Sequence, residues 1–155
     1  MNKQTIVNEI VARLDAELRR YAKAAQVAHA EATDEQSRAE NKYDTRGLEA
    51  SYLAHGQSRQ VVDTEQAREQ YTSLNLRDFS SGEPIGIGAL IELAGRDERL
   101  WYFLGPAAGG TEVECDGQEI FVITPLSPLG RSLVGKRQGE QVQQGRDVQR
   151  IAQVI

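Results

Sequence analysis

The stretch ITPLSPLGRSLVGK, residues 123–136, decides the fold, because an apolar run is followed there by the start and stop signals of one short helix. Ser127 can accept a hydrogen bond from the free N–H groups of the first turn, and Pro128 lacks an N–H at a position that needs none. Gly135 suits a left-handed stop, and Lys136 complements the negative end of the helix. We therefore expect a strand end followed by one short capped helix.

Short apolar runs surround the predicted helix, Ser127–Val134. Six of them have the length and composition of strands: Ala89–Ala94, Leu100–Leu104, Thr111–Cys115, Glu119–Ile123, Glu140–Gln143 and Val148–Val154. Several short strands around one helix indicate a small α+β domain. We place this domain at residues 85–155.

The first half of the chain has helical periodicity instead. One apolar stripe recurs in steps of three or four: Ile6, Ile10, Leu14, Leu18, Tyr21, Ala25 and Ala28. A thinner stripe follows: Leu48, Tyr52, His55, Val62, Ala67, Tyr71 and Leu74. Polar residues dominate 32–45 between them. We expect an antiparallel coiled-coil hairpin over 1–74, with both stripes in its interface, its tip near 32–45 and a linker at 75–84.

Composition limits the class of protein. The 155 residues are 39% hydrophobic and 26% charged, as in soluble globular proteins, and no apolar run is long enough to cross a bilayer. Cys115 is the only cysteine, which excludes an internal disulfide and favours the cytoplasm. The net charge of −5 argues against a sequence-specific DNA-binding protein and favours a protein partner or a basic channel.

Two motifs resemble the Gre transcript-cleavage factor family of bacteria. One is SPLGRSLVGK at residues 127–136, here called the signature segment, and the other is the pair Glu40-Asn41 at the predicted hairpin tip. The resemblance covers nearly the whole chain. It implies an FKBP-like C-terminal domain that docks on the rim of the RNA polymerase secondary channel, and a coiled coil that reaches down the channel to the active site. The expected function is that of a cytoplasmic transcription elongation factor.

The resemblance also implies an acidic, metal-holding tip. The family typically has an Asp three positions before the Glu of this pair, where the present chain has Ser37. Two carboxylates could hold the second magnesium ion of the polymerase and position the attacking water. Glu40 is the best candidate, with Asp44 or Asp34 as its partner, and the sequence does not decide between them.

Further contacts follow from the same resemblance. Asn41 and Tyr43 could contact the 3′ end of the nascent RNA or shape the tip. The rim of the channel would meet a short list of residues: Leu126, Ser127, Pro128 and Leu129. Leu126 stands where the family often has an acidic residue, so apolar contact would replace a charged one.

Several readings stay open at this point. The protein would have no enzymatic activity or cofactor of its own and would share magnesium with the polymerase, either stimulating RNA cleavage or only occupying the channel. An FKBP-like prolyl isomerase or chaperone is the alternative from another class, and it needs an apolar, aromatic-lined pocket. A coiled-coil adaptor unrelated to polymerase would explain the hairpin but not the signature segment.

Overall fold

The computed structural model describes residues 1–33, 46–80, 82–95, 98–144 and 147–155. They form a helix pair and a mixed sheet, so the predicted α+β class is confirmed. The chain divides into two compact units, one made of Met1–Val11 with Glu69–Ile155 and the other of Ala12–Arg68. The domain bounds expected from the sequence, a hairpin at 1–74, a linker at 75–84 and a C-terminal domain at 85–155, stay a prediction.

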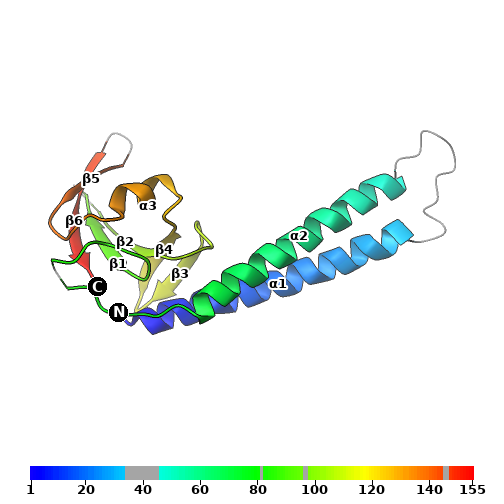
Figure 1. Cartoon of the computed structure of the whole chain (residues 1–155), viewed down its shortest axis with the longest axis horizontal. Helices are drawn as coiled ribbons and strands as arrows, with labels where there is room; N and C mark the ends of the chain where they lie inside the picture. The colour runs from blue at the N-terminus through cyan, green and yellow to red at the C-terminus, as the bar shows by residue number, and fades with distance from the viewer. Residues whose placement is uncertain (34–45, 81, 96–97, 145–146) are drawn as a thin grey trace. The chain divides into compact units, whose positions relative to one another are not determined.

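The Ala12–Arg68 unit holds most of two long helices, α1 (Lys3–Thr33) and α2 (Arg46–Thr72). They lie side by side and run antiparallel (Figure 1), and Arg68 Nε donates to Asp15 Oδ1 across the pair at 2.5 Å. The predicted stripe of α1 is confirmed, since all seven of its residues are buried or half-buried.

The predicted stripe of α2 is wrong over most of its length. Leu48, Tyr52, His55 and Val62 are exposed. The buried or half-buried face consists instead of a different set: Ala54, Gln57, Val61, Thr64, Ala67 and Tyr71. Because α2 carries apolar residues on two faces, periodicity alone could not identify the one that meets α1.

The described strands form one six-stranded sheet in the order β3-β4-β2-β1-β6-β5. Their bounds are Leu90–Ala94 (β1), Arg99–Leu104 (β2), Glu112–Cys115 (β3), Gln118–Ile123 (β4), Gln141–Gln144 (β5) and Asp147–Val154 (β6). Only β2 and β4 pair in parallel; the other four pairings are antiparallel. Each strand lies within one residue of its predicted bounds.

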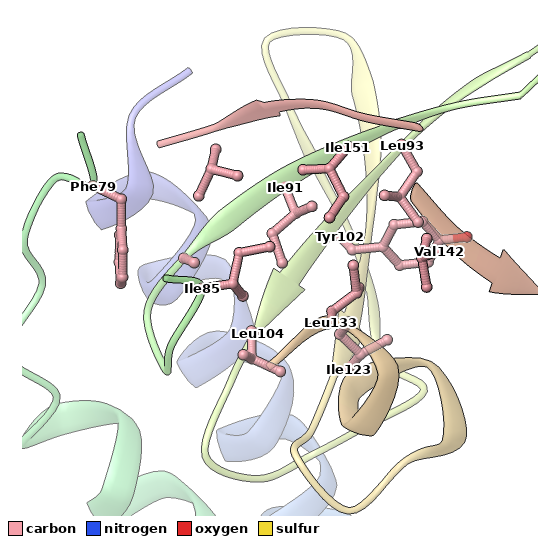
Figure 2. Close-up of a cluster of buried hydrophobic side chains, with 12 residues drawn as sticks. Phe79, Ile85, Ile91, Leu93, Tyr102, Leu104, Ile123, Leu133, Val142 and Ile151 are labelled. Atoms are coloured by element: carbon pink, nitrogen blue, oxygen red, sulfur yellow. The ribbon is translucent and has the colours of Figure 1, made fainter. Parts of the chain in front are cut away.

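One core fills the space between the sheet and helix α3 (Pro128–Leu133) (Figure 2). Leu133 is fully buried there beside Tyr102 of β2 and Ile151 of β6. Trp101 and Phe103 are buried on the opposite face of β2, as the alternation of a strand requires. The sheet is therefore covered on both faces, and α3 is held against one of them.

None of the helices in the described ranges has the length and apolar character needed to cross a bilayer.

Candidate functional site

The signature segment begins with the predicted helix cap. Ser127 has extended backbone angles, φ −70° and ψ 153°, and its Oγ accepts a hydrogen bond from the N–H of Gly130 at 3.1 Å. The same hydroxyl donates to the carbonyl oxygen of Thr124 at 2.8 Å, and Pro128 opens the helix. Both polar capacities of Ser127 are therefore used inside the protein.

Gly130 is required by close packing. A Cβ at this position would lie 1.9 Å from the carbonyl oxygen of Thr124, which is backbone and cannot move aside cheaply. Gly135 ends the segment with φ +82°, the left-handed conformation that favours glycine. The fold itself thus explains Ser127, Gly130 and Gly135.

The helix ends somewhat differently from the sequence-based expectation for Lys136. Its backbone N–H donates to the carbonyl oxygen of Leu133 at 3.0 Å, which satisfies one of the last free acceptors. Its side-chain Nζ lies 3.6 Å from Glu140 Oε1. The backbone of Lys136 therefore contacts the end of α3, while its charged side chain pairs with Glu140.

Leu126, which precedes the signature segment, and Pro128, which opens α3, are both exposed. Leu126 is 82% exposed, the highest value among the large apolar residues described, and Pro128 is exposed beside it. Leu129 is half-buried and packs against the core. Apolar side chains held out by a rigid, capped turn are suited to burial against another molecule.

A cavity of about 680 Å³ opens next to these residues. Its lining comprises Leu100, Tyr102, Gly109, Gly110, Phe121, Val122, Ile123, Thr124, Ser127, Pro128, Leu129 and Gln143. The rings of Tyr102 and Phe121 lie 5.8 Å apart between centroids and are tilted by 38°. Three of the four predicted rim-binding residues thus line the same hollow.

Sequence reasoning missed Tyr102 and Phe121 as site residues. The alternation of β2 placed Tyr102 on one face, but the partner strand could not be known. The parallel register between β2 and β4 sets Tyr102 opposite Phe121 and brings both rings to the face that carries α3. Because β3 separates β2 from β4 along the chain, no local sequence pattern could indicate that these two strands pair.

The chemistry that this cavity can supply is binding. Its side chains are mainly apolar, and the Ser127 hydroxyl is already engaged at both ends. The described residues contain no group of three or more His, Cys, Asp or Glu side chains arranged to hold a metal ion. The cavity is suited to an apolar group of a partner.

The predicted tip residues fall outside the described part of the chain. They are Asp34, Ser37, Glu40, Asn41, Tyr43 and Asp44. The flanking helices end at Thr33 and begin at Arg46, so the segment lies between α1 and α2 as expected. The magnesium-holding role of Glu40, Asp44 or Asp34 stays a prediction.

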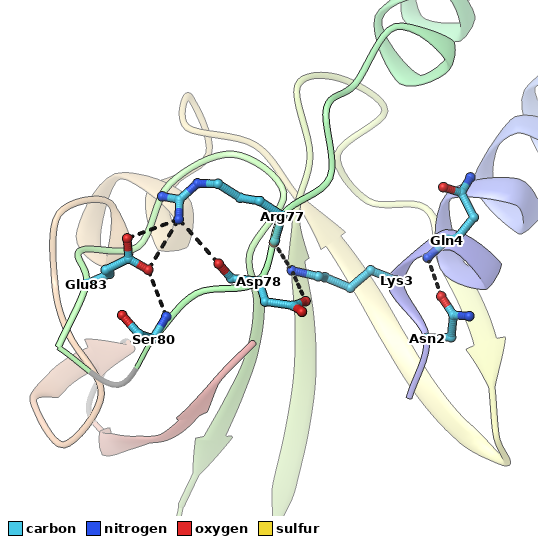
Figure 3. A network of polar contacts seen from close by, with 7 residues as sticks. All are labelled: Asn2, Lys3, Gln4, Arg77, Asp78, Ser80 and Glu83. Atoms are coloured by element: carbon cyan, nitrogen blue, oxygen red, sulfur yellow. Dashed lines mark hydrogen bonds and ion pairs between the residues drawn. The ribbon is translucent and has the colours of Figure 1, made fainter.

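A polar network connects the start of α1 to the segment that follows α2 (Figure 3). Lys3 is buried; its Nζ donates to the carbonyl oxygen of Arg77, and lies 3.5 Å from Asp78 Oδ1. Burial lowers the pKa of Lys3, and the Asp78 carboxylate partly opposes that shift. The network fastens the two ends of the helix pair within the unit that contains the sheet.

Glu83 extends this network. Its carboxylate accepts from the backbone N–H of Ser80 at 2.8 Å and from Arg77 Nη1 at 3.1 Å. These hydrogen bonds, chiefly the one from Ser80, hold the pKa of Glu83 below its usual value. The Arg77 guanidinium lies 4.1 Å from the ring centre of Phe79, which belongs to the core. This segment is therefore packed against the sheet unit.

Solved structures of Gfh1 proteins are among those similar to this chain. No protein-family model matches the chain, and no curated protein matches it. The structure of the GreA factor homolog 1 (Gfh1) protein of Thermus thermophilus is 22% identical, with a TM-score of 0.39, and the match covers 94% of both chains.

Two further structures are similar at the same level. One is described as the transcription factor Gfh1; it is 21% identical, has a TM-score of 0.38, and the match covers 93% of this chain and 92% of that chain. The other is Gfh1 of Thermus aquaticus, which is 24% identical over 92% of both chains, with a TM-score of 0.38. Likeness at this level carries no argument about function.

Proposed function

We propose that this protein is a bacterial transcription elongation factor that binds RNA polymerase at the rim of its secondary channel. The observation that carries the proposal is the start of the signature segment, where a capped turn keeps Pro128 exposed in the lining of an apolar cavity and Leu126, just before it, is exposed as well. The resemblance to the Gre family assigns rim docking to this segment. The helix pair supplies the arm that would enter the channel.

The exposed leucine suggests how docking is stabilised. Burying a leucine side chain completely contributes about 1.5–3 kcal/mol. Residues that dominate an interface tend to sit at its desolvated centre, and Leu126 beside the cavity is placed for such a role. An apolar side chain of the partner would fill the cavity while Leu126 is covered.

The finer proposal concerns RNA cleavage. Glu40, paired with Asp44 or Asp34, would add carboxylate ligands to the second magnesium ion in the polymerase active site. Asn41 and Tyr43 would meet the 3′ end of the RNA. The protein would complete the site of another enzyme and have no activity alone. A non-cleaving regulator that occupies the same channel is the alternative within this class.

Rim docking is tested by competition for core RNA polymerase against labelled wild-type protein. We expect Pro128→Glu to weaken docking about tenfold or more, because a charge would be buried in the contact. Val148→Glu is the matched control, since Val148 is an exposed apolar residue on β6 of the same unit. Equal competition by both variants would refute the docking surface.

Cleavage is tested on stalled polymerase complexes that carry backtracked RNA. Glu40→Ala should abolish stimulation and leave binding intact. Glu31→Ala, which changes an exposed acid of α1, should leave both stimulation and binding unchanged. Wild-type protein that binds without stimulating cleavage would favour the non-cleaving regulator.

The cavity also gives a reason to keep the second candidate function. A hollow of about 680 Å³ that contains Tyr102 and Phe121 is the kind of apolar, aromatic site that a prolyl isomerase or chaperone needs. An isomerisation assay on a proline-containing peptide decides this point. Catalysis that Tyr102→Ala removes would support this candidate, and no rate increase is expected under the main proposal.

A further inference from the structure

Helix α2 presents a second periodic stripe on the face turned away from α1. The stripe consists of Leu48, Tyr52, His55, Arg59 and Val62, here called the outer seam. These residues follow one another in steps of four, three, four and three, which is the heptad spacing of a coiled-coil seam. All five are exposed, so α2 carries two seams and α1 covers only the other one.

The exposure of the outer seam is large for apolar residues. Leu48 is 57% exposed, Tyr52 71% and Val62 50%. By contrast, the seam that faces α1 is made largely of alanine, glutamine and threonine. Leu48, Tyr52 and Val62 therefore keep half or more of their surface exposed on the outer seam, where folding buries little of their apolar area.

Gly56 is a second observation on this part of the helix. It lies between Tyr52 and Arg59, and a Cβ there would meet no other atom within 4 Å. A glycine inside a helix is less favourable than alanine. Since no neighbour within the protein requires it, close approach of another molecule is a physical reason for its presence.

The charges beside the outer seam select the kind of partner. The flanking positions are occupied by acids and small residues: Glu49, Ser51, Gly56, Ser58, Asp63 and Glu65. A second copy of this chain packed on the same seam would bring acidic flanks together, and among the seam and flank positions it would offer only Arg59 as a cation to oppose them. Flanking charges of opposite sign are what favours one helical partner over another.

We propose that the outer seam binds an amphipathic helix of another protein, one whose apolar stripe is flanked by Lys and Arg. Tyr52 and Val62 pack into that stripe, Gly56 permits close approach, and Asp63 and Glu65 pair with the basic flanks. The proposal rests on the proposed function only in taking RNA polymerase as the first molecule in which to look for this helix.

The seam is tested with a synthetic helical peptide of about four heptads that carries a Leu and Ala stripe and Lys at the flanking positions. We expect the full-length protein to bind it, and the double variant Tyr52→Ser/Val62→Ser to bind about tenfold or more weakly at unchanged helix content. A peptide with Glu at the flanks should bind weakly to both. No preference for the Lys peptide would overturn the proposal.

A matched variant isolates the seam from the rest of the helix. Gln60→Ser changes an exposed residue of α2 that lies off the outer seam, and it should leave peptide binding unchanged. Equal loss in this control and in the double variant would also contradict the proposal. Sedimentation of the wild-type protein tests whether a second copy of the chain occupies the seam instead. A dimer that Tyr52→Ser dissociates would assign the seam to a second copy and overturn the proposal.

The polymerase arm of the experiment separates this proposal from the proposed function. A photoreactive side chain placed at Tyr52 should cross-link to a Lys- or Arg-flanked helix of core RNA polymerase, and one placed at Gln60 should not. If the protein binds the Lys peptide but does not bind RNA polymerase, the proposed function is refuted and the outer-seam proposal is still supported. If the protein binds polymerase through Leu126 and Pro128 but shows neither binding of the Lys peptide nor a cross-link from position 52, the outer-seam proposal alone is refuted.

Discussion

Individual residues set the geometry of the signature segment through backbone contacts. The carbonyl oxygen of Thr124 accepts hydrogen bonds from both the N–H and the hydroxyl of Ser127, and it also faces the Cα of Gly130. One acceptor thus fixes where α3 starts and how closely it approaches β4. The exposure of Leu126 depends on this arrangement, because Leu126 lies between Thr124 and Ser127.

Gly130→Ala should destabilise the protein strongly. The added methyl group would overlap the Thr124 carbonyl, and overpacking of this kind costs about 1–3 kcal/mol. Urea unfolding followed by far-ultraviolet circular dichroism measures the change. Gly82→Ala is the control, since a Cβ there meets nothing within 4 Å, and an equal loss in both variants would contradict the packing argument.

Tyr71 anchors the end of α2 on the sheet unit. Its hydroxyl donates to the carbonyl oxygen of Ala107 at 2.8 Å, and the ring approaches Gly105 so closely that a Cβ there would lie 2.0 Å from the hydroxyl oxygen. Burial raises the pKa of Tyr71 well above its ordinary value of 10.0. The folded protein therefore holds this proton more tightly than the unfolded chain does.

That difference predicts a loss of stability at alkaline pH. Below pH 10 both states keep the proton, and above it the unfolded state loses the proton first, so the contribution of Tyr71 declines as pH rises. Tyr71→Phe should cost about 1 kcal/mol at pH 7 through the lost hydrogen bond. Its free energy of unfolding should approach that of the wild type between pH 10 and 11. If the two free energies of unfolding differ by the same amount at every pH, the role given to the Tyr71 proton would be contradicted. Lys3 is present in both proteins, so its contribution cancels in this difference.

Among the elements, the strands and α3 were predictable and the packing of α2 was not. Strand bounds follow from apolar runs between glycines, and the cap of α3 follows from Ser127 and Pro128, so local chemistry was sufficient. The buried face of α2 depends on which stripe meets α1. Between residues 48 and 62, Leu48, Tyr52 and Val62 lie on the other stripe, so a rule that selects for apolarity chose the wrong face there.

The cavity shows the same limit at the site. Leu126 and the first three residues of the signature segment could be named together from the sequence, because they are consecutive. Tyr102 and Phe121 meet only through the parallel pairing of β2 with β4, which no local pattern encodes. The sequence therefore could not identify Tyr102 and Phe121 as cavity residues, and the docking role of Leu126–Leu129 stays a prediction.

Ser127→Ala tests the cap of α3 at the scale of the element. Loss of an N-cap hydroxyl costs about 1 kcal/mol, and here the bond to Thr124 is lost as well. Ser132→Ala is the matched control, since its hydroxyl donates only to the Leu129 carbonyl within the helix region. Thermal unfolding should show a larger drop for Ser127→Ala, and a larger drop for Ser132→Ala would refute the capping role.

At the scale of the whole molecule, the first eleven residues belong with the sheet unit rather than with the rest of α1. Ile6, Val7 and Ile10 are buried in that part of the chain, and the Lys3 network fastens it to residues 77 and 78. The sheet unit is therefore assembled from both sides of the helix pair. Its folding should not depend on residues 12–68.

This independence can be measured by excision. Replacing residues 12–68 with a flexible linker of about six residues should leave a protein that unfolds cooperatively, because packed helices lie only about 8–10 Å apart. The near-ultraviolet signal of buried Trp101 reports the native sheet unit. Loss of a cooperative transition would contradict the division into units. The excised protein should still compete for core RNA polymerase if docking resides in Leu126 and Pro128.

Strand β6 lies between β1 and β5, although its residues come last in the described chain. During translation, one edge of β1 therefore stays unpaired until β6 has been synthesised, and an unpaired strand edge is prone to aggregation. A nascent chain that stalls before residue 147 would leave the sheet incomplete beside β1. The surface that carries Leu126 would then lack part of the sheet that supports it. Chains from interrupted synthesis should therefore be degraded by proteases and should not compete with the full-length protein for RNA polymerase.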